Sequence, residues 1–254
     1  MPESGNLAYG LYRAFWIGLD WLYPPRCGGC GQRGGRWCAN CQRSSRAILP
    51  PVCTQCGQPQ SRPGLCPRCQ QTPYAFTALR SWAVFAGPVR RALHRLKYRR
   101  DVALGEALAR PLIDMLRTLR WPVDLVVPVP LGLARLAQRG YNQSALLAKP
   151  LALACGLAYQ PQALRRARET RSQVGLSAAS RRENVSGAFQ ADRQSVSGKV
   201  ILVMDDVATS GATLDACASA LLQAEARRVY CLTLARAIQQ LSTSQGDASS
   251  LMDG

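Results

Sequence analysis

One stretch of the sequence, residues 198–222, joins an apolar run, two acids and a turn of small residues. Val200–Met204 contains no polar residue, which is typical of a strand buried on both faces of a parallel sheet. Asp205 and Asp206 follow at its carboxyl end and suit sugar hydroxyls. A small-residue turn that opens a helix offers backbone N–H groups to a phosphate. The stretch therefore predicts an α/β fold with a ribose 5-phosphate site, whose turn consists of Ala208, Thr209, Ser210, Gly211, Ala212 and Thr213.

Eight of the eleven cysteines fall in four Cys-x-x-Cys pairs between residues 27 and 69. Two thiolates on one tight turn hold one cation, and a second pair completes a tetrahedral set. Pairing along the chain predicts two structural zinc sites, although a cross-braced pairing of the first pair with the third stays open. Neither set leaves an open position for catalysis, and we expect the segment to unfold without metal. The predicted ligands are Cys27, Cys30, Cys38 and Cys41 at one site, and Cys53, Cys56, Cys66 and Cys69 at the other.

The net charge of +17 favours polyanionic partners. Only three of the 32 basic residues are lysines, and arginine is the better residue for bidentate phosphate contacts. A genome with GC-rich codons explains the arginine excess about as well.

The cysteine spacing is typical of metal sites, and this predicts a reducing cytoplasm. No apolar run reaches the length of a transmembrane segment. The N-terminus has no basic region ahead of an apolar stretch and no small-residue cleavage site. We therefore expect a cytoplasmic protein.

Apolar residues recur at helical spacing near the N-terminus, and Pro24-Pro25 ends the pattern. We expect this amphipathic helix to pack on the protein's own domain or on a partner subunit, so an oligomer is one expectation. Docking on a membrane surface is the lesser alternative, because the polar face is not strongly basic. The stripe consists of Leu7, Leu11, Phe15, Leu19 and Leu22, and Tyr12 and Trp16 widen it.

The remaining periodicity predicts further strands and helices. A helix at Leu104–Leu119 contains Pro111, which we expect to kink or split it. A helix running to Cys155 opens at residues 138–143. The predicted strands are Thr77–Phe85, Val123–Val127, Leu164–Arg168 and Val229–Ala235, and a helix is predicted over Arg90–Tyr98.

Two basic segments accompany these elements. The loop from Pro128 to Gly140 ends a strand and carries Arg139 just before a helix, which makes it a second, weaker anion site. The connection between Leu164 and Arg193 has the character of a loop that closes over a charged ligand, or of an ordinary solvated loop. Within it, Ser177 is suited to cap a short helix. His94, the only histidine, belongs to a basic face rather than to a general base.

Taken together, these motifs resemble the ComF family, the ComFC/GntX-like proteins of bacterial competence within the type I phosphoribosyltransferase superfamily. The resemblance covers nearly the whole chain, and residues 198–222 carry its most specific part. It also includes the Pro24-Pro25 lead into the Cys-x-x-Cys pairs and the segments His94–Tyr98, Val127–Pro130, Arg139–Gln143, Thr170–Leu176, Arg181–Val185 and Gly187–Phe189.

The resemblance implies a site for phosphoribosyl pyrophosphate (PRPP). Asp205 and Asp206 would bind the ribose 2′- and 3′-hydroxyls, and residues 208–213 would surround the 5′-phosphate. The Pro128–Gly140 loop with Arg139 would lie near the pyrophosphate, and Thr170–Asn184 would be the flexible active-site loop. Mg²⁺ would bridge the pyrophosphate and ribose oxygens and keep most of its waters. Asp205, Asp206 and Arg139 would be the catalytic residues.

Two functions fit this resemblance. In one, the chain is a PRPP-binding protein of natural competence that handles internalised single-stranded DNA with partner proteins of the competence machinery. In the other, it is a phosphoribosyltransferase of nucleotide metabolism, with an acceptor that the sequence does not identify. The expected organisation is an amphipathic helix at 1–25, a double zinc-ribbon module at 26–72, a phosphoribosyltransferase-like domain at 73–236 and a disordered tail at 237–254.

Overall fold

The computed structural model describes residues 7–168 and 187–238. The predicted closing loop at 170–184, with its helix capped by Ser177, and the tail from residue 239 onward lie outside these residues. The domain boundaries inferred from the sequence stay predictions. Among the described residues, no helix is long and apolar enough to cross a membrane.

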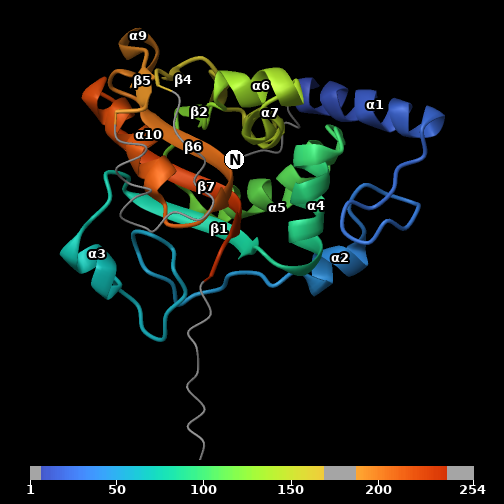
Figure 1. Cartoon of the computed structure of the whole chain (residues 1–254), viewed down its shortest axis with the longest axis horizontal. Helices are drawn as coiled ribbons and strands as arrows, with labels where there is room; N and C mark the ends of the chain where they lie inside the picture. The colour runs from blue at the N-terminus through green and yellow to red at the C-terminus, as the bar shows by residue number, and fades with distance from the viewer. Residues whose placement is uncertain (1–6, 169–186, 239–254) are drawn as a thin grey trace, which may run out of the picture.

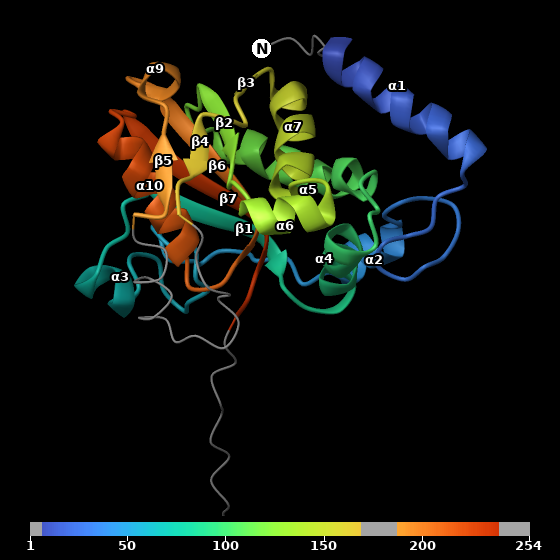
Figure 2. The same cartoon turned by 45° about the horizontal axis from the view of Figure 1, so that its top comes forward.

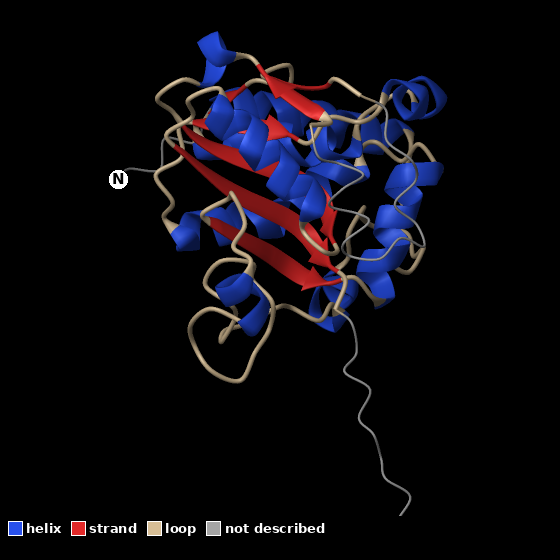
Figure 3. Ribbon diagram, turned by 60° about the vertical axis from the view of Figure 1, so that its left-hand side comes forward, coloured by secondary structure: helices blue, strands red, loops and turns tan. Residues whose placement is uncertain are grey.

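A five-stranded sheet lies at the centre, and every neighbouring pair of its strands is parallel. The predicted α/β class is thereby confirmed, and Figure 3 shows helices on both faces of the sheet. The strand order is β1-β7-β6-β2-β3, with β1 at Ala78–Val84, β2 at Leu125–Pro128, β3 at Ala158–Tyr159, β6 at Val200–Ala208 and β7 at Arg228–Arg236.

Two apolar cores fill the spaces on either side of this sheet. The first core includes residues of α10 (Ala212–Gln223) and of a small antiparallel sheet, β4 (Leu164–Arg166) with β5 (Phe189–Ala191). A short helix, α9 (Arg193–Val196), follows β5. The second core lies under three helices. Figure 1 shows these layers, in which the three helices are α4 (Gly87–Tyr98), α5 (Leu104–Leu119) and α7 (Gln143–Cys155).

The connections of two neighbouring strands run in opposite directions. From β2 the chain passes through α7 to β3 at one edge, whereas from β6 it passes through α10 to β7 on the other side. Because α7 and α10 belong to different cores, the chain that leaves β2 and the chain that leaves β6 turn to opposite faces of the sheet. Such a switch point opens a crevice at the carboxyl ends of the strands, where α/β folds bind ligands.

The segment with the four cysteine pairs wraps the edge of the sheet formed by β1. The N–H of Ile48 donates to the carbonyl of Trp82 at 2.9 Å, and the N–H of Val84 donates to that of Arg46 at 2.8 Å. The N–H of Leu79 donates to the carbonyl of Gln55 at 2.7 Å. These bonds occupy an edge that is otherwise open to other chains. Two short helices, α2 (Ala39–Ser44) and α3 (Pro67–Gln71), complete this segment.

The N-terminal helix α1 (Leu7–Leu22) forms as predicted, but its leucine stripe does not pack on the domain. Leu7, Leu11 and Phe15 are 78%, 65% and 61% exposed. The aromatic residues that widen the stripe contact the domain instead: Tyr12 lies under Lys149 of α7, and Trp16 lies under Arg36. Figure 2 shows α1 beside α7 at the periphery of the molecule.

Three details differ from the sequence-based expectations. A helix, α6 (Leu133–Arg139), occupies the segment that we expected to be a loop. Helix α5 continues past Pro111, so that the proline does not split it. Strand β6 runs to Ala208, so the two acids lie within its last four residues rather than after its end.

Candidate functional site

The two acids of β6 have different partners. The carboxylate of Asp206 is buried and forms an ion pair with Nζ of Lys97, which comes from α4. Asp205 stays partly exposed, and its Oδ1 accepts a hydrogen bond of 2.8 Å from Oγ of Ser144 at the start of α7. Consecutive strand residues point to opposite faces, which separates the two side chains. The pair therefore ties β6 to both helices that end at the crevice.

The surroundings of Asp205 oppose its ionisation. Desolvation by burial, followed by the negative charge of Asp206, raises the pKa of Asp205 to about 7. The Ser144 hydroxyl, the N–H of Asp206 and the charge of Lys97 act in the other direction. Burial also opposes the charge on Lys97, but the Asp206 carboxylate raises the pKa of this lysine. Asp205 is thus poised to change its protonation state when donors approach it.

The turn at residues 208–213 follows directly at the crevice. Within residues 7–168 and 187–238, the backbone N–H groups of Thr209, Ser210 and Gly211 donate to no partner. Gly211 has a φ of +81°, a left-handed conformation that favours glycine, and α10 begins at the next residue, Ala212. Thr209 is exposed, Thr213 is half-buried, and Ala208 and Ser210 are buried. Three open N–H groups ahead of a helix N-terminus suit an anion.

Arg139 contacts residues of both α7 and α4. It is the last residue of α6, and its Nη1 donates to Oε1 of Gln143 on α7. Its guanidinium lies 5.6 Å from the ring centre of Tyr98, the residue after Lys97. The turn between α6 and α7 is fixed because Asn142 donates to the carbonyl of Val129 at 2.9 Å. Two cations, Lys97 and Arg139, therefore gather beside the acid pair.

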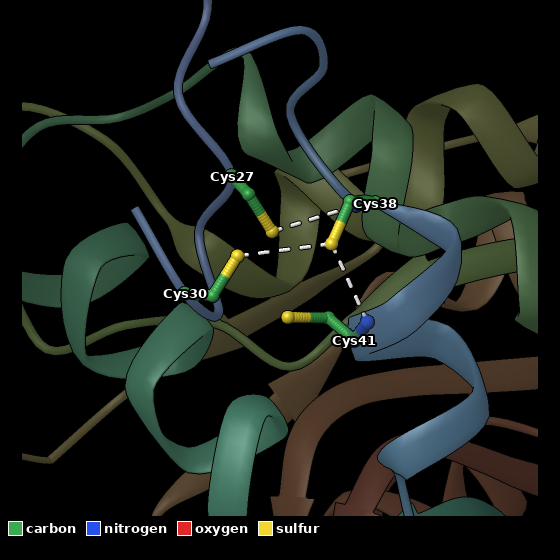
Figure 4. Close-up of side chains that lie close together, drawn as sticks. All are labelled: Cys27, Cys30, Cys38 and Cys41. Atoms are coloured by element: carbon green, nitrogen blue, oxygen red, sulfur yellow. Dashed lines mark hydrogen bonds between the residues drawn. The ribbon is translucent and has the colours of Figure 1, made fainter. Parts of the chain in front are cut away.

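Each set of four cysteines forms a compact cluster, and the pairing is along the chain. Within each set, the Sγ atoms all lie within 4.8 Å of one another. The Sγ atoms of Cys30 and Cys38 are 3.7 Å apart, and those of Cys56 and Cys66 are 3.8 Å apart. A tetrahedral site with Zn–S bonds of about 2.3 Å has sulfurs about 3.8 Å apart. Four-thiolate sets of this size fit zinc, and Figure 4 shows the first of them.

Backbone donors favour the thiolate form in both clusters. Burial opposes ionisation of Cys27, but N–H groups led by that of Cys38 lower its pKa to about 6. For Cys53, burial is likewise outweighed by N–H groups led by that of Cys66, and its pKa is also about 6. Zinc binds thiolates, so these bonds prepare each cluster for metal.

A basic cleft of about 780 Å³ lies between the first cysteine cluster and α4. Arg91 and Arg95 donate to backbone carbonyls of this cluster at Gly29 and Cys27, at 2.5 Å and 3.1 Å. The remaining lining comes from Gly28–Gly31, His94 and Arg99. The ring of His94 lies 4.8 Å from that of Tyr98, which is 66% exposed. The cleft thus combines cations with the ring of His94, which contacts the exposed ring of Tyr98 beside it.

Sequence reasoning missed the roles of Lys97 and Ser144. Lys97 entered the sequence analysis only as part of the segment His94–Tyr98, whereas in the structure it pairs with Asp206. Its position, four residues after buried Leu93 on α4, was the available indication that it points inward. Ser144 follows the predicted start of α7 by one position, and helix N-termini are common ligand positions. Arg139 contacts the ring of Tyr98, next to Lys97, and its place near the pyrophosphate stays a prediction.

Comparison with known proteins identifies both parts of the chain. Residues 18–70 match the family described as Double zinc ribbon domain, and residues 117–252 match the family described as Phosphoribosyl transferase domain. The DNA utilization protein YhgH of Salmonella typhi is 37% identical over 203 residues, which cover 77% of this chain and 88% of that protein. Competence protein F of Haemophilus influenzae is 28% identical over 79% of this chain and 90% of its own length. Competence protein ComFC of Bacillus subtilis is 28% identical over 78% and 83%, respectively.

Proposed function

This chain belongs to the family of competence proteins F and ComFC and of the DNA utilization protein YhgH, which contains a phosphoribosyltransferase domain, and we propose that it binds PRPP and handles single-stranded DNA during natural transformation. One observation carries the PRPP proposal. The acid pair and the turn with three open N–H groups lie together at the end of β6, Lys97 pairs with Asp206, and Arg139 contacts the ring of Tyr98 next to Lys97.

The chemistry of these groups assigns each part of the ligand. Asp205 and Asp206 accept hydrogen bonds from the ribose 2′- and 3′-hydroxyls, and the turn at 208–213 receives the 5′-phosphate through its N–H groups. Lys97 and Arg139 lie where the pyrophosphate charge needs neutralising. Mg²⁺ accompanies PRPP as a hard cation on its oxygens and keeps most of its waters, so it needs few protein ligands.

PRPP binding is expected to release protons from Asp205. Hydroxyl donors favour the ionised carboxylate, so the ligand lowers a pKa that stands at about 7 in the free protein. Between the bound and the free pKa, the complex holds fewer protons than the free protein. Release should therefore approach one proton below pH 7 and vanish by about pH 9. Calorimetry in buffers of different ionisation enthalpy measures it.

PRPP has phosphates that titrate in the same range, so a reference is needed. Asp205→Asn removes the carboxylate but leaves the proton release from the ligand's own phosphates. The difference in proton release between wild type and variant is therefore the contribution of Asp205. Equal proton release by the two proteins would contradict this account of the site.

The DNA-handling part of the proposal is supported by the basic cleft. Exposed cations on α4 alternate with His94 and Tyr98, and Arg139 lies against Tyr98. Nucleic acid without secondary structure is bound by such a combination, because phosphates meet arginines and bases stack on rings. None of the residues that line the cleft belongs to the acid pair or to the turn, whereas Arg139, which contacts Tyr98, belongs to the proposed pyrophosphate end of the PRPP site.

Arg99→Ala is expected to weaken binding of a labelled single-stranded oligonucleotide and to reduce its salt dependence. Each lost phosphate contact lowers the slope of log K against log salt by about 0.7 for single strands. Arg120→Ala is the matched control: this exposed arginine follows α5, just before β2 begins, at the opposite end of the strands. Fluorescence anisotropy at several salt concentrations measures both slopes. A slope that stays the same in Arg99→Ala, or binding that does not depend on salt, would remove the cleft from the proposal.

A second function, phosphoribosyl transfer, is favoured by the position of Lys97 and Arg139. In this reaction the bond from ribose C1 to a pyrophosphate oxygen breaks, pyrophosphate leaves with the electron pair, and an acceptor atom bonds to C1. The transition state is oxocarbenium-like, so neutralising the leaving group supplies much of the catalysis. A screen for pyrophosphate release from PRPP against candidate acceptors tests it, with the Asp205→Asn, Asp206→Asn protein as the blank.

Two further parts of the proposal concern the metal and the compartment. The eight clustered cysteines hold two structural zinc ions, one for each set, which the fit of the sulfur spacing supports. Thiolate sites of this kind persist where cysteines stay reduced, and this supports a cytoplasmic location. Total metal content per chain, measured on protein purified under reducing conditions, tests the zinc assignment.

A further inference from the structure

The carbonyl of Ser210, in the middle of the turn at 208–213, is held from outside the turn. The hydroxyl of Tyr74 donates to it at 2.6 Å, and Nη1 of Arg68 donates to it at 3.1 Å. The guanidinium of Arg68 also lies 5.0 Å from the ring centre of Tyr74. The same ring packs against Gly211, where an added Cβ would come within 3.3 Å of it. One carbonyl thus receives two donors from a part of the chain more than 130 positions away.

Holding this carbonyl also sets the direction of the next N–H. The peptide bond between Ser210 and Gly211 is trans and planar, so its C=O and N–H point in opposite directions. Because the carbonyl points to Tyr74 and Arg68, the N–H of Gly211 points away from them. If this peptide flipped, the carbonyl oxygen would take the place of an N–H donor and would repel an anion.

Both donors are fixed by the second cysteine cluster. Arg68 lies on α3, between Cys66 and Cys69. The backbone of Tyr74 is bonded to one side chain of the same cluster: its N–H donates to Oε1 of Gln55, and its carbonyl accepts from Nε2 of Gln55 at 3.0 Å. The first cluster has Asn40 where the second has Arg68, and Asn40 is exposed. Only the second cluster therefore reaches the turn by this position.

We infer that Arg68 and Tyr74 are positioning residues, which hold the Ser210–Gly211 peptide in the orientation that binds the 5′-phosphate. The inference rests on the proposed PRPP site and adds to it a dependence on the second zinc ribbon. Neither residue touches the ligand. They act through the backbone of the turn, so their effect is confined to the phosphate end of the site.

The test compares two ligands that occupy different ends. Ribose 5-phosphate uses the turn, whereas inorganic pyrophosphate uses the end near Lys97 and Arg139. For ribose 5-phosphate we expect a loss of about tenfold in Tyr74→Phe and in Arg68→Ala, and about a hundredfold in the double variant. Pyrophosphate affinity should stay within about twofold. Arg68→Lys, which keeps one donor, should recover most of the affinity, and Asn40→Ala should match the wild type.

Each outcome separates the two claims. If the wild type binds neither ribose 5-phosphate nor PRPP, the proposed function fails and this inference fails with it. If the wild type binds and the variants bind equally well, the inference alone is overturned. An equal loss for ribose 5-phosphate and pyrophosphate, or a loss of zinc from the variants, means general damage and also overturns it. Titration calorimetry and metal analysis of the full chain supply these measurements.

Discussion

The Asp205→Asn, Asp206→Asn double variant is expected to lose PRPP affinity by a factor of at least about 100. Each carboxylate that accepts from a ribose hydroxyl contributes a charge-assisted hydrogen bond of about 1.5–3 kcal/mol, and an amide oxygen supplies less. Single-stranded DNA binding should persist, because the basic cleft contains neither acid. Calorimetry with PRPP and Mg²⁺, together with anisotropy for the oligonucleotide, measures both effects on one preparation.

The substitution at Asp206 has a second consequence that needs a control. It leaves Lys97 without its buried partner, and a broken pair of this kind lowers stability. Asp205→Asn alone keeps the ion pair and should already weaken PRPP binding. Asp114→Asn, an exposed acid on α5, controls for the change of charge. Unchanged PRPP affinity in the double variant would overturn the assignment of the acids.

Removal of zinc should have the largest effect on stability, and the second cluster should matter more than the first. Zinc binding to short cysteine segments is worth about 10–16 kcal/mol, which is as large as the whole stability of a domain, about 5–15 kcal/mol. Cys53, Cys56 and Cys69 belong to the first core, together with Phe76 and Leu79. The buried cysteines of the first cluster, Cys27 and Cys41, belong to neither core.

We therefore expect Cys53→Ser, Cys69→Ser to lower the melting temperature much more than Cys27→Ser, Cys41→Ser. Chelation of the wild type gives a second measurement, which does not require the former variant to fold. Zinc release, followed with a chromogenic chelator, should coincide with a change in circular dichroism and with rapid proteolysis around residues 26–72. Near-unchanged circular dichroism after complete chelation would contradict a structural role for the metal.

The sequence was most informative where a local pattern determines a local structure. The apolar run of β6, the spacing of the cysteine pairs and the small residues before α10 each predicted what the structure contains. The order of the cysteine pairs in the sequence did not decide between sequential and cross-braced pairing, because Cys-x-x-Cys turns can share a metal in both arrangements. In the structure each cluster consists of successive pairs, and the chain between the two clusters bonds to β1 at Arg46 and Ile48.

Contacts between distant segments were the part that local patterns could not supply. Helix α6 was missed because prolines and a glycine precede it and only seven residues form it. Helix α1 was predicted correctly as a helix, but Leu7, Leu11 and Phe15 of its stripe stay exposed, and the contacts with the domain come from Tyr12 and Trp16 at the edge of the stripe. Its aromatic and charged side chains contact the domain through Lys149 and Arg36, a choice that depends on residues far along the chain.

The bond between Arg68 and Ser210 shows the same limit in the functional site. Arg68 is one arginine among many, and its position between two cysteines favoured no role beyond solvation. Its contact with Ser210 spans 142 positions in the sequence, so no window of sequence contains both ends. The acids and the turn were predictable because they share one stretch, whereas the groups that orient them come from α3, α4 and α7.

The backbone bonds along β1 have a consequence beyond the ligand site. Most sheets keep their edge strands from pairing with other molecules by means of charges, prolines or short length. In this protein Arg46, Ile48 and Gln55 make those bonds, and they lie in the segment that we expect to fold only with metal. In a cell short of zinc, the chain would therefore expose the β1 edge of the sheet and tend to self-associate. The solubility of the protein would then depend on its supply of zinc.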